Sequence, residues 1–336
     1  MKQPESVLII QTAFIGDVIL ATALLESLHH KFPEAKIDFV VRKGNEALLQ
    51  GHPFIRELFV FDKKNKFRNL IGLIGKIRKK KYDYVINVQR FATTGIMTVL
   101  SGAKVTVGFD KNPLSFLFSK KITHQQEGLH EVERNNRLIE FLTGSKEKSK
   151  PRLYPTPDQF EKVKEFTKDR YITVSPASVW FTKQFPVEKW IEFVSEVPDH
   201  FRIFILGAPS DKELGEEIIR SVPSRDIVNL AGKLSLLESA ALMKNSEMNY
   251  VNDSAPMHLS SALNAPVSAV YCSTVTDFGF GPLSDKSFVI EIIEDLDCRP
   301  CGLHGHRECP MGHFKCALNI QKEQLLATII RQEPSI

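Results

Sequence analysis

The chain has 336 residues, which is enough for two hydrophobic cores of ordinary domain size. Apolar residues make up 43% of it and charged residues 25%, close to the averages of soluble globular proteins, which excludes fibrous and disordered classes. The net charge of +4 is too small to imply a nucleic-acid partner, and we expect none.

The sequence carries no recognisable export or membrane-spanning signal. No stretch reaches the roughly 18 apolar residues that a membrane-spanning helix needs. The apolar N-terminal region is interrupted by Asp17 and lacks a small-residue cleavage site, so it does not resemble a signal peptide. We therefore expect a cytoplasmic protein whose five cysteines are reduced or metal-bound rather than disulfide-paired.

The first half of the chain alternates short apolar runs with amphipathic segments, the pattern of a parallel sheet flanked by helices. Strands are predicted at 6–11, 37–41, 58–61 and 84–88, and helices at 16–31, 67–80 and 130–142. The stretch 143–158 that follows is rich in Lys, Ser and Pro and indicates an interdomain linker.

A basic run, residues 63–81, contains nine Lys or Arg residues and no acid. It fits a solvated helix face with a basic turn. It fits equally a patch that meets anionic lipid or a phosphorylated acceptor. The sequence leaves both interpretations open.

The alternation of strands and helices restarts after the linker. Strands are predicted at 171–175, 202–206, 226–229, 248–252 and 267–271, and helices at 187–196, 211–220, 236–244 and 255–263. We predict two Rossmann-like α/β domains facing a cleft, residues 1–150 and 151–320, and a last helix in 321–336 that could cross back to the first domain. Ligands of such sheets bind outside the carboxyl ends of the strands, so the loops there should carry the chemistry.

Two acids stand at predicted helix starts. The loop after the first strand contains Gly16 and Asp17 but no G-x-G-x-x-G, so the dinucleotide fingerprint of a dehydrogenase is absent. Asp17 fits either an N-cap or a carboxylate base that projects into the cleft. Asp211, which follows a strand and Gly207, fits either an N-cap or an acid that bonds ribose hydroxyls.

The loop 175–186 suits a phosphate-bearing ligand. Hydroxyls at Ser175, Ser178 and Thr182 precede Lys183. Lysine offers a compact positive charge and hydroxyls donate hydrogen bonds. An ordinary polar loop is the alternative.

The segment 251–263 is a candidate anion site at a helix start. Asn252, Asp253 and Ser254 end a strand, and Ala255 opens a helix whose exposed N–H groups can bind an anion. His258 follows one turn later on the face of Ser254. The alternative for this histidine is a buried, hydrogen-bonded side chain.

Four cysteines near the C-terminus follow the spacing C-x2-C-x7-C-x6-C, which suits a tetrahedral zinc site. The alternatives are reduced cysteines that pack a loop, or oxidation-labile pairs. Since no open coordination position is evident, we expect no catalytic metal here. The residues are Cys298, Cys301, Cys309 and Cys316, with His304, His306 and His313 interleaved.

Three segments occur in the order F-I-G-D-V-I-L-A-T-A-L-L-E-S-L, P-A-S-V-W-F-T-K-Q-F-P-V-E-K-W and N-D-S-A-P-M-H-L-S-S-A-L-N-A-P-V-S-A-V-Y. Together they resemble the ADP-heptose lipopolysaccharide heptosyltransferases of glycosyltransferase family 9. The cysteine segment, C-R-P-C followed by R-E-C-P-M-G-H and a last Cys, is similar to the heptosyltransferase II branch. The resemblance extends from Val7 to about Ile320.

This resemblance implies a glycosyltransferase B-type fold, with the acceptor held by the first domain and the nucleotide-sugar donor mainly by the second. It implies inverting transfer of heptose from ADP-heptose to the inner core of lipopolysaccharide, with no cofactor and no catalytic metal. It also implies peripheral contact with the inner face of the inner membrane.

The resemblance assigns roles to individual residues. Asp17 matches the catalytic base of the family's G-D motif, and Lys183 stabilises the leaving diphosphate. The donor-binding residues that match are Gly16, Ser178, Thr182, Lys183, Asp211, Asp253, Ser254, Ala255 and His258.

Some positions depart from the family pattern. Ala255 replaces a usual Gly, Ser175 replaces a Pro-Gly-type start, and Phe185 stands where Trp is common. The donor is therefore open, and two alternatives remain. One is a transferase or epimerase of the same fold that uses another nucleotide sugar. The other is a non-catalytic nucleotide-sugar-binding protein with a structural zinc.

Overall fold

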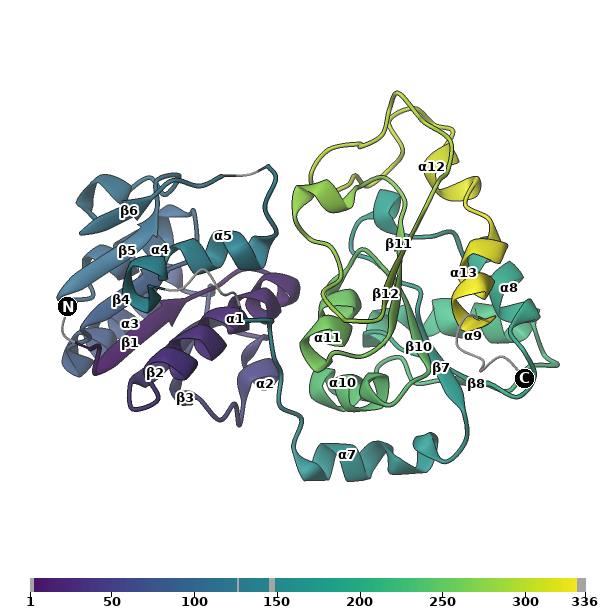
Figure 1. Ribbon diagram of the computed structural model, residues 1–336, viewed down its shortest axis with the longest axis horizontal. Helices are drawn as coiled ribbons and strands as arrows, with labels where there is room; N and C mark the ends of the chain where they lie inside the picture. Colours follow the sequence, from purple (N-terminus) through teal and green to yellow (C-terminus); the bar gives the residue numbers. More distant parts are fainter. Residues whose placement is uncertain (1–2, 126, 145–148, 331–336) are drawn as a thin grey trace. The chain divides into compact units, whose positions relative to one another are not determined.

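The structure is a computed structural model that describes residues 3–125, 127–144 and 149–330 (Figure 1). The chain divides into two compact units, Met1–Tyr154 and Pro155–Ile336. Each unit contains one six-stranded sheet in which the paired strands run parallel. The predicted α/β class and the two parallel sheets are thus confirmed.

The first unit has the strand order β3-β2-β1-β4-β5-β6. Its strands are β1 (Ser6–Ile10), β2 (Lys36–Arg42), β3 (Ile55–Phe61), β4 (Tyr84–Asn87), β5 (Val105–Phe109) and β6 (Lys120–Ile122). Its helices are α1 (Ile15–Lys31), α2 (Glu46–Leu49), α3 (Lys66–Lys80), α4 (Ala92–Val99), α5 (Glu131–Arg137) and α6 (Glu140–Thr143).

Strand β1 lies inside the first sheet because it is apolar on both faces. The four residues Val7–Ile10 are completely buried, as parallel strands covered on two sides require. Helix α3 closes one face with an apolar stripe at helical spacing, which packs against Phe59 and Phe61 of β3. That stripe consists of Leu70, Leu73, Ile74 and Ile77.

The second unit has the strand order β12-β11-β10-β7-β8-β9. Its strands are β7 (Tyr171–Ser175), β8 (Arg202–Ile205), β9 (Ile227–Asn229), β10 (Met248–Asn252), β11 (Val267–Tyr271) and β12 (Ser287–Glu291). Its helices are α7 (Pro157–Val163), α8 (Val187–Glu196), α9 (Lys212–Ser221), α10 (Leu236–Lys244), α11 (Ala255–Leu263), α12 (Lys315–Leu318) and α13 (Lys322–Ile330).

The last helix, α13, packs on the second unit. Leu325 and Ile329 belong to the same buried cluster as Trp190 and Phe193 of α8, and Tyr250 of β10 donates a hydrogen bond to the Leu325 carbonyl (3.2 Å). The sequence left open whether this last helix crosses back to the first domain. Its described residues pack against α8 of the second unit. Residues 331–336 of that segment are outside the described part of the chain.

Several elements differ from those predicted. The helix expected at 130–142 is divided into α5 and α6, and α7 occupies part of the expected linker. That helix forms because Thr156 and Gln159 make a capping box, with Gln159 Oε1 accepting the Thr156 N–H (2.8 Å). The elements α2, α4, β5, β6, β12 and α12 were not predicted.

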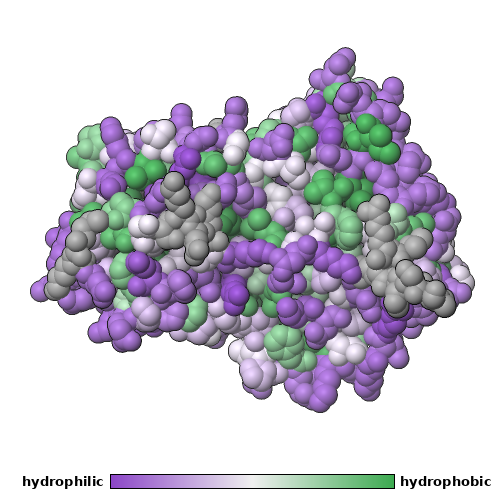
Figure 2. All heavy atoms as spheres, in the orientation of Figure 1, coloured by the Kyte–Doolittle hydropathy of each residue, from purple (hydrophilic) through white to green (hydrophobic). Residues whose placement is uncertain are grey.

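No helix in the described residues is long and apolar enough to cross a membrane. On the face seen in Figure 2, hydrophobic residues are scattered among a larger number of hydrophilic ones. Apolar side chains scattered singly over a surface are ordinary in soluble proteins. An exposed apolar residue therefore indicates a binding surface only where its spacing from other apolar residues and the charges around it are unusual.

Candidate active site

Asp17 lies in the first turn of α1, directly after the carboxyl end of β1. The helix begins one residue earlier than predicted, and Phe14 with its extended backbone is the N-cap. Asp17 is therefore the third helical residue, and its Oδ2 accepts the Phe14 N–H (3.1 Å). Asp17 does help to cap the helix, as one of the two interpretations predicted. It does so as the third helical residue, by accepting the N–H of the N-cap Phe14, and is not the N-cap itself.

The environment of Asp17 favours its protonated form. Burial, and next the negative charge of Glu131, raise its pKa to about 6. Hydrogen bonds from the backbone and the charge of Arg90 act in the opposite direction and are outweighed. A carboxyl group with a pKa near neutrality is suited to accept a proton in a reaction and release it afterwards.

Arg90 and Glu131 were not identified from the sequence. Arg90 follows β4, the neighbour of β1 in the sheet, and Glu131 opens α5. A polar residue just after a central strand is the signal that would have selected Arg90. Nothing local in the sequence marks Glu131, because its influence depends on where α5 packs.

Lys183 is fixed by an ion pair. It lies in a 3-10 turn, Phe181–Lys183, and its Nζ is 2.6 Å from Asp253 Oδ2. Thr274 Oγ1 donates to the same oxygen (2.7 Å). The side chains of Lys183 and Asp253 are 17% and 7% exposed, so the amine is held in place at a mostly buried carboxylate. The contact that the structure gives Asp253 is therefore with the Lys183 amine, which it positions.

Two hydrogen bonds attach the loop of Lys183 to the end of β10, and a third lies within the loop. Asn252 Oδ1 accepts the Phe185 N–H (2.9 Å), and its Nδ2 donates to the Pro176 carbonyl (2.8 Å). Gln184 Oε1 accepts the Ser178 N–H (3.3 Å). Ser178 therefore lies in a loop whose two ends are hydrogen-bonded to Asn252 at the end of β10.

Helix α11 begins next to the ion pair. Ser254 is its N-cap, with an extended backbone, and its hydroxyl donates to the Asn252 carbonyl (3.4 Å). The first N–H groups of a helix point out of its N-terminus and carry partial positive charge. Ala255 is the first residue of this helix, and His258 lies buried one turn later. Lys183 and this helix end together bring positive charge to the site, and the Asp253 carboxylate offsets part of it.

Thr182 has a different environment from the one expected of a direct ligand contact. Its side chain is buried, and its Oγ1 accepts hydrogen bonds from the Ser273 hydroxyl (3.0 Å) and the His306 N–H (2.8 Å). Its backbone pairs with His306 as well, through the Thr182 N–H (3.1 Å). These contacts hold the turn that presents Lys183, and a direct donor contact stays a prediction.

Asp211 caps the 3-10 turn Pro209–Asp211, and at the N-cap position of α9 its side chain makes no capping hydrogen bond to that helix. Its Oδ2 accepts the Ala208 N–H (2.8 Å), and its Oδ1 accepts the Ser210 hydroxyl (2.9 Å). A Cβ at Gly207 would lie 2.9 Å from the Asp211 Cβ, so glycine is required for this close approach. A ribose contact by Asp211 stays a prediction.

The cysteine segment packs against the strand end that carries Ser273 and Thr274. Cys301 N–H donates to the Ser273 carbonyl (2.7 Å), and Arg299 donates to the Cys272 and Thr274 carbonyls (2.8 Å each). These bonds connect the segment to the Thr274–Asp253–Lys183 contacts. Ser273, Thr274 and Arg299 were not identified from the sequence as part of the site, although Ser273 and Thr274 follow a predicted strand closely.

The thiols of this segment are unpaired and influence one another. Burial first, then Cys309 and Cys298, raise the pKa of Cys301 and that of Cys316, the latter to about 11. Cys298 Sγ lies 3.9 Å from His313 Nε2. Within the described residues, no group of three or more His, Cys, Asp or Glu side chains is placed to hold a metal ion. The backbone contacts pack the segment, and zinc binding by its cysteines stays a prediction.

Gly305 in this segment leaves room for Lys183. Its φ of +79° is in the left-handed region, and a Cβ there would lie 2.9 Å from Lys183 Cγ. We expect Gly305→Ala to displace the lysine and raise the KM for the donor. Gly312→Ala is a matched control, because Gly312 has a φ of +72° and its Cβ would meet no described atom within 4 Å. Both substitutions strain the backbone, but only that at Gly305 introduces a contact with Lys183. Steady-state kinetics of the two variants therefore separate the effects, and an equal KM for the donor in both would refute the role of the contact.

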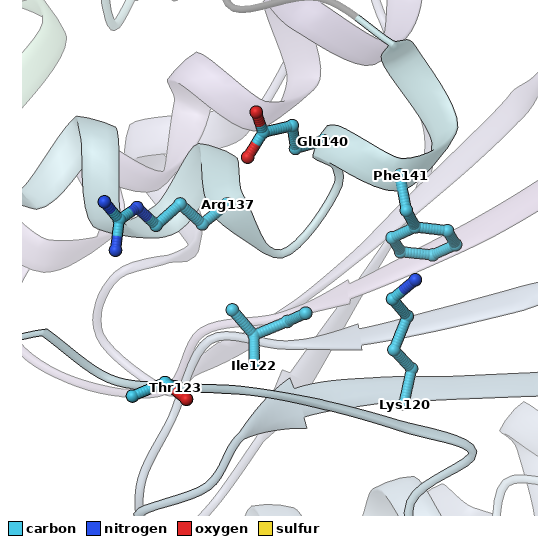
Figure 3. A pocket seen from close by; sticks show the side chains of 6 residues that line it. All are labelled: Lys120, Ile122, Thr123, Arg137, Glu140 and Phe141. Carbon is cyan, nitrogen blue, oxygen red and sulfur yellow. The ribbon is translucent and has the colours of Figure 1, made fainter.

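A pocket of about 490 Å³ lies elsewhere in the first unit, along β6, α5 and α6 (Figure 3). Lys120 Nζ lies 4.1 Å above the ring of Phe141 on one side of it, and Arg137 extends on the other. Its lining is Lys120, Ile122, Thr123, Arg137, Glu140 and Phe141, and it includes none of the predicted site residues.

Known proteins resemble this chain along most of its length. Lipopolysaccharide heptosyltransferase 3 of Escherichia coli K12 is 25% identical over 77% of this chain and 80% of its own length. The lipopolysaccharide core heptosyltransferase OpsX of Haemophilus influenzae is 23% identical over 100% of this chain and 96% of its own length.

Solved structures share the fold. A family 9 glycosyltransferase of Veillonella parvula superposes with a TM-score of 0.84 at 22% identity, covering 98% of both chains. Heptosyltransferase II of E. coli gives 0.81 at 21% identity, covering 98% of this chain and 100% of that one. The E. coli heptosyltransferase WaaC with ADP-2-deoxy-2-fluoro heptose gives 0.73 at 18% identity, with the same coverage. The glycosyltransferase B-type fold is thereby confirmed.

The sequence also matches a protein family directly. Residues 71–314 fit the profile of glycosyltransferase family 9 (heptosyltransferase). This match spans well over half of the chain and includes Lys183, Asp253 and the first three cysteines of the cysteine segment, whereas Asp17 and Cys316 lie outside it. The chain therefore belongs to glycosyltransferase family 9 and is a glycosyltransferase.

Proposed function

We propose that the protein transfers heptose from ADP-heptose to the inner core of lipopolysaccharide, with inversion at the anomeric carbon. The relatives named above are lipopolysaccharide heptosyltransferases, and WaaC has been solved with a fluorinated ADP-heptose. The observation that carries the proposal is the Lys183–Asp253 ion pair at the N-terminus of α11. A fixed cation beside a helix N-terminus suits a diphosphate leaving group.

The reaction exchanges one bond at the anomeric carbon for another and moves one proton. The acceptor hydroxyl oxygen attacks the anomeric carbon as the bond from that carbon to the diphosphate oxygen breaks. The hydroxyl proton passes to the Asp17 carboxylate, and the electron pair of the broken bond leaves with ADP. Lys183 and the α11 N–H groups stabilise the charge that develops on the diphosphate. In this scheme protein groups supply the positive charge, and we propose that no catalytic metal takes part.

The pH dependence of transfer follows from the raised pKa of Asp17. Only the ionised carboxylate accepts a proton, so the base is available above its pKa of about 6 and is lost as the pH falls through that value. We expect kcat/KM to fall about tenfold per pH unit below this point and to level off above it. A rate-versus-pH profile measures this. A rate that stays level down to pH 4 would exclude Asp17 as the base.

The test of the proposed function is ADP release from ADP-heptose with and without a deep-truncated lipopolysaccharide acceptor. Acceptor-dependent release is the expected result. The same assay with other ADP-, GDP- and UDP-sugars tests donor choice, and faster turnover of one of those sugars would replace heptose. Treatment with a chelator should leave the rate unchanged, and loss of activity restored by a metal would contradict the metal-free scheme.

We further propose that the protein works at the inner face of the inner membrane in peripheral contact with it. The proposed acceptor is a glycolipid whose acyl chains lie in the bilayer. A protein that reaches its sugars from the cytoplasm benefits from residing at that surface, because the search for substrate is then confined to it.

A further inference from the structure

Helix α3 exposes two large apolar side chains that its packing does not need. The leucines and isoleucines of the stripe that faces the sheet are already buried in the core of the first unit. Phe67 and Ile71 stand outside that stripe and are 80% and 71% exposed. They are four residues apart, so they lie next to each other on one side of the helix. The two side chains form a small apolar surface, which we call the α3 apolar pair.

Cations surround the α3 apolar pair. Arg68, Lys76 and Lys79 are exposed, and with helical spacing they fall on the outward side of the helix. More lie in the preceding turn, where burial and the charges of Arg42 and Lys66 lower the pKa of Lys63. No acidic residue occurs from 63 to 81. Lys80 of the helix pairs with Glu57 of β3, whereas Arg68, Lys76 and Lys79 have no acid beside them on the helix. The helix therefore combines apolar anchors with an excess of positive charge.

The distribution of these cations favours an extended anionic surface over a single phosphate. Helix α3 has 15 residues and is about 22 Å long, and basic residues occur at both of its ends. Side chains spread over that length cannot converge on one phosphate group. Amphipathic helices that lie on a membrane have this composition, with aromatic and aliphatic residues beside a lysine- and arginine-rich face.

We propose that α3 docks the protein on an anionic lipid bilayer, with Phe67 and Ile71 entering the boundary between headgroups and acyl chains. The cations of the helix meet the phosphates of neighbouring lipids. This docking gives the peripheral membrane contact a location, and it rests on the proposed function only in so far as the acceptor is a membrane glycolipid. Docking requires no rearrangement of α3, because the α3 apolar pair is already exposed.

The experiment is sedimentation of the purified full chain with lipid vesicles. We expect binding to vesicles that contain phosphatidylglycerol, weakening with added salt, and little binding to phosphatidylcholine alone. Phe67→Ser with Ile71→Ser should weaken binding roughly tenfold. Ile293→Ser is the matched control, since Ile293 is also 80% exposed but lies in the second unit among acids such as Glu294 and Asp295.

A second readout reports insertion directly. The fluorescence of Phe67→Trp should shift to shorter wavelength with anionic vesicles and stay unchanged with phosphatidylcholine. The melting temperatures of these variants should match that of the wild type, because both side chains are exposed. Unchanged sedimentation of the double variant, or the absence of a fluorescence shift, would refute the docking surface.

A deacylated, water-soluble acceptor separates docking from catalysis. Transfer to it should be the same for the wild type and the Phe67/Ile71 variant, whereas transfer to acceptor embedded in vesicles should fall in the variant. No transfer by the wild type to either acceptor would contradict the proposed function and leave the vesicle-binding result unaffected.

If Lys76→Glu with Lys79→Glu raised the KM for the deacylated acceptor and left vesicle binding intact, the basic run would bind the acceptor instead, and the docking proposal would be wrong.

Discussion

Asp17→Asn is expected to reduce heptose transfer by about a thousandfold while leaving the affinity for ADP nearly unchanged. The amide cannot take the proton of the acceptor hydroxyl. Its oxygen can still accept the Phe14 N–H that the carboxylate accepts now (3.1 Å), so the start of α1 keeps its cap. Acceptor-dependent ADP release and calorimetric titration with ADP measure the two effects.

A matched control tests the effect of changing a capping acid to its amide. Glu133 Oε2 accepts the His130 N–H (3.3 Å) at the start of α5, which is the same arrangement in the same unit. Glu133→Gln should therefore change the melting temperature as little as Asp17→Asn and should retain transfer. If Asp17→Asn lost ADP affinity and transfer to the same degree, or melted much earlier, capping alone would explain the residue.

The assignment of Asp17 as base and its capping role are compatible. Capping fixes the direction of the carboxyl group, and burial with the charge of Glu131 raises its pKa to about 6. The sequence offered these as competing interpretations because it shows the residue type but not what surrounds it. In the structure Asp17 accepts the N–H of the N-cap residue Phe14, and its role as the base remains the proposal that the variant tests.

Predictions from apolar patterning succeeded where strands are long and buried. β1, β7, β10 and β11 were placed within a residue, since each is a run of apolar residues between turn signals. β6 is three residues long and reads K-K-I, so the strand forms through pairing with β5 rather than from its own composition. Likewise, Leu138 and Ile139 continue the apolar periodicity of α5, although the helix ends before them.

The contacts that organise the candidate site could not be read from the sequence. Lys183 and Asp253 were both selected, but as separate phosphate-binding residues 70 positions apart rather than as an ion pair. Thr274 completes that pair from the end of a third strand. The cysteine segment was considered for zinc, and its backbone contacts with Ser273 and Thr182 emerge only from the fold. Long-range pairings of this kind depend on which strand ends are adjacent.

Lys183→Ala is expected to weaken binding of the nucleotide sugar and to slow turnover together, lowering kcat/KM by roughly two to three orders of magnitude. In the proposed scheme the amine contacts the diphosphate in the ground state and gains interaction energy as charge develops on it. Calorimetry with ADP reports the first effect, and steady-state transfer reports the second. An unchanged donor affinity would refute the phosphate role.

The same substitution should also destabilise the protein, and this must be separated from the loss of binding. Removing the lysine leaves the Asp253 carboxylate, 7% exposed, with a hydrogen bond from the Thr274 hydroxyl (2.7 Å) but without the cation that it pairs with among the described residues. Breaking a buried ion pair from one side costs about 3–5 kcal/mol, and this partly exposed pair should lie below that range. Lys183→Ala with Asp253→Asn removes the unpaired charge, so it should regain much of the lost melting temperature without regaining donor affinity. Recovery of both would mean that the lysine serves to neutralise Asp253 and that the diphosphate is held by the N-terminus of α11 alone.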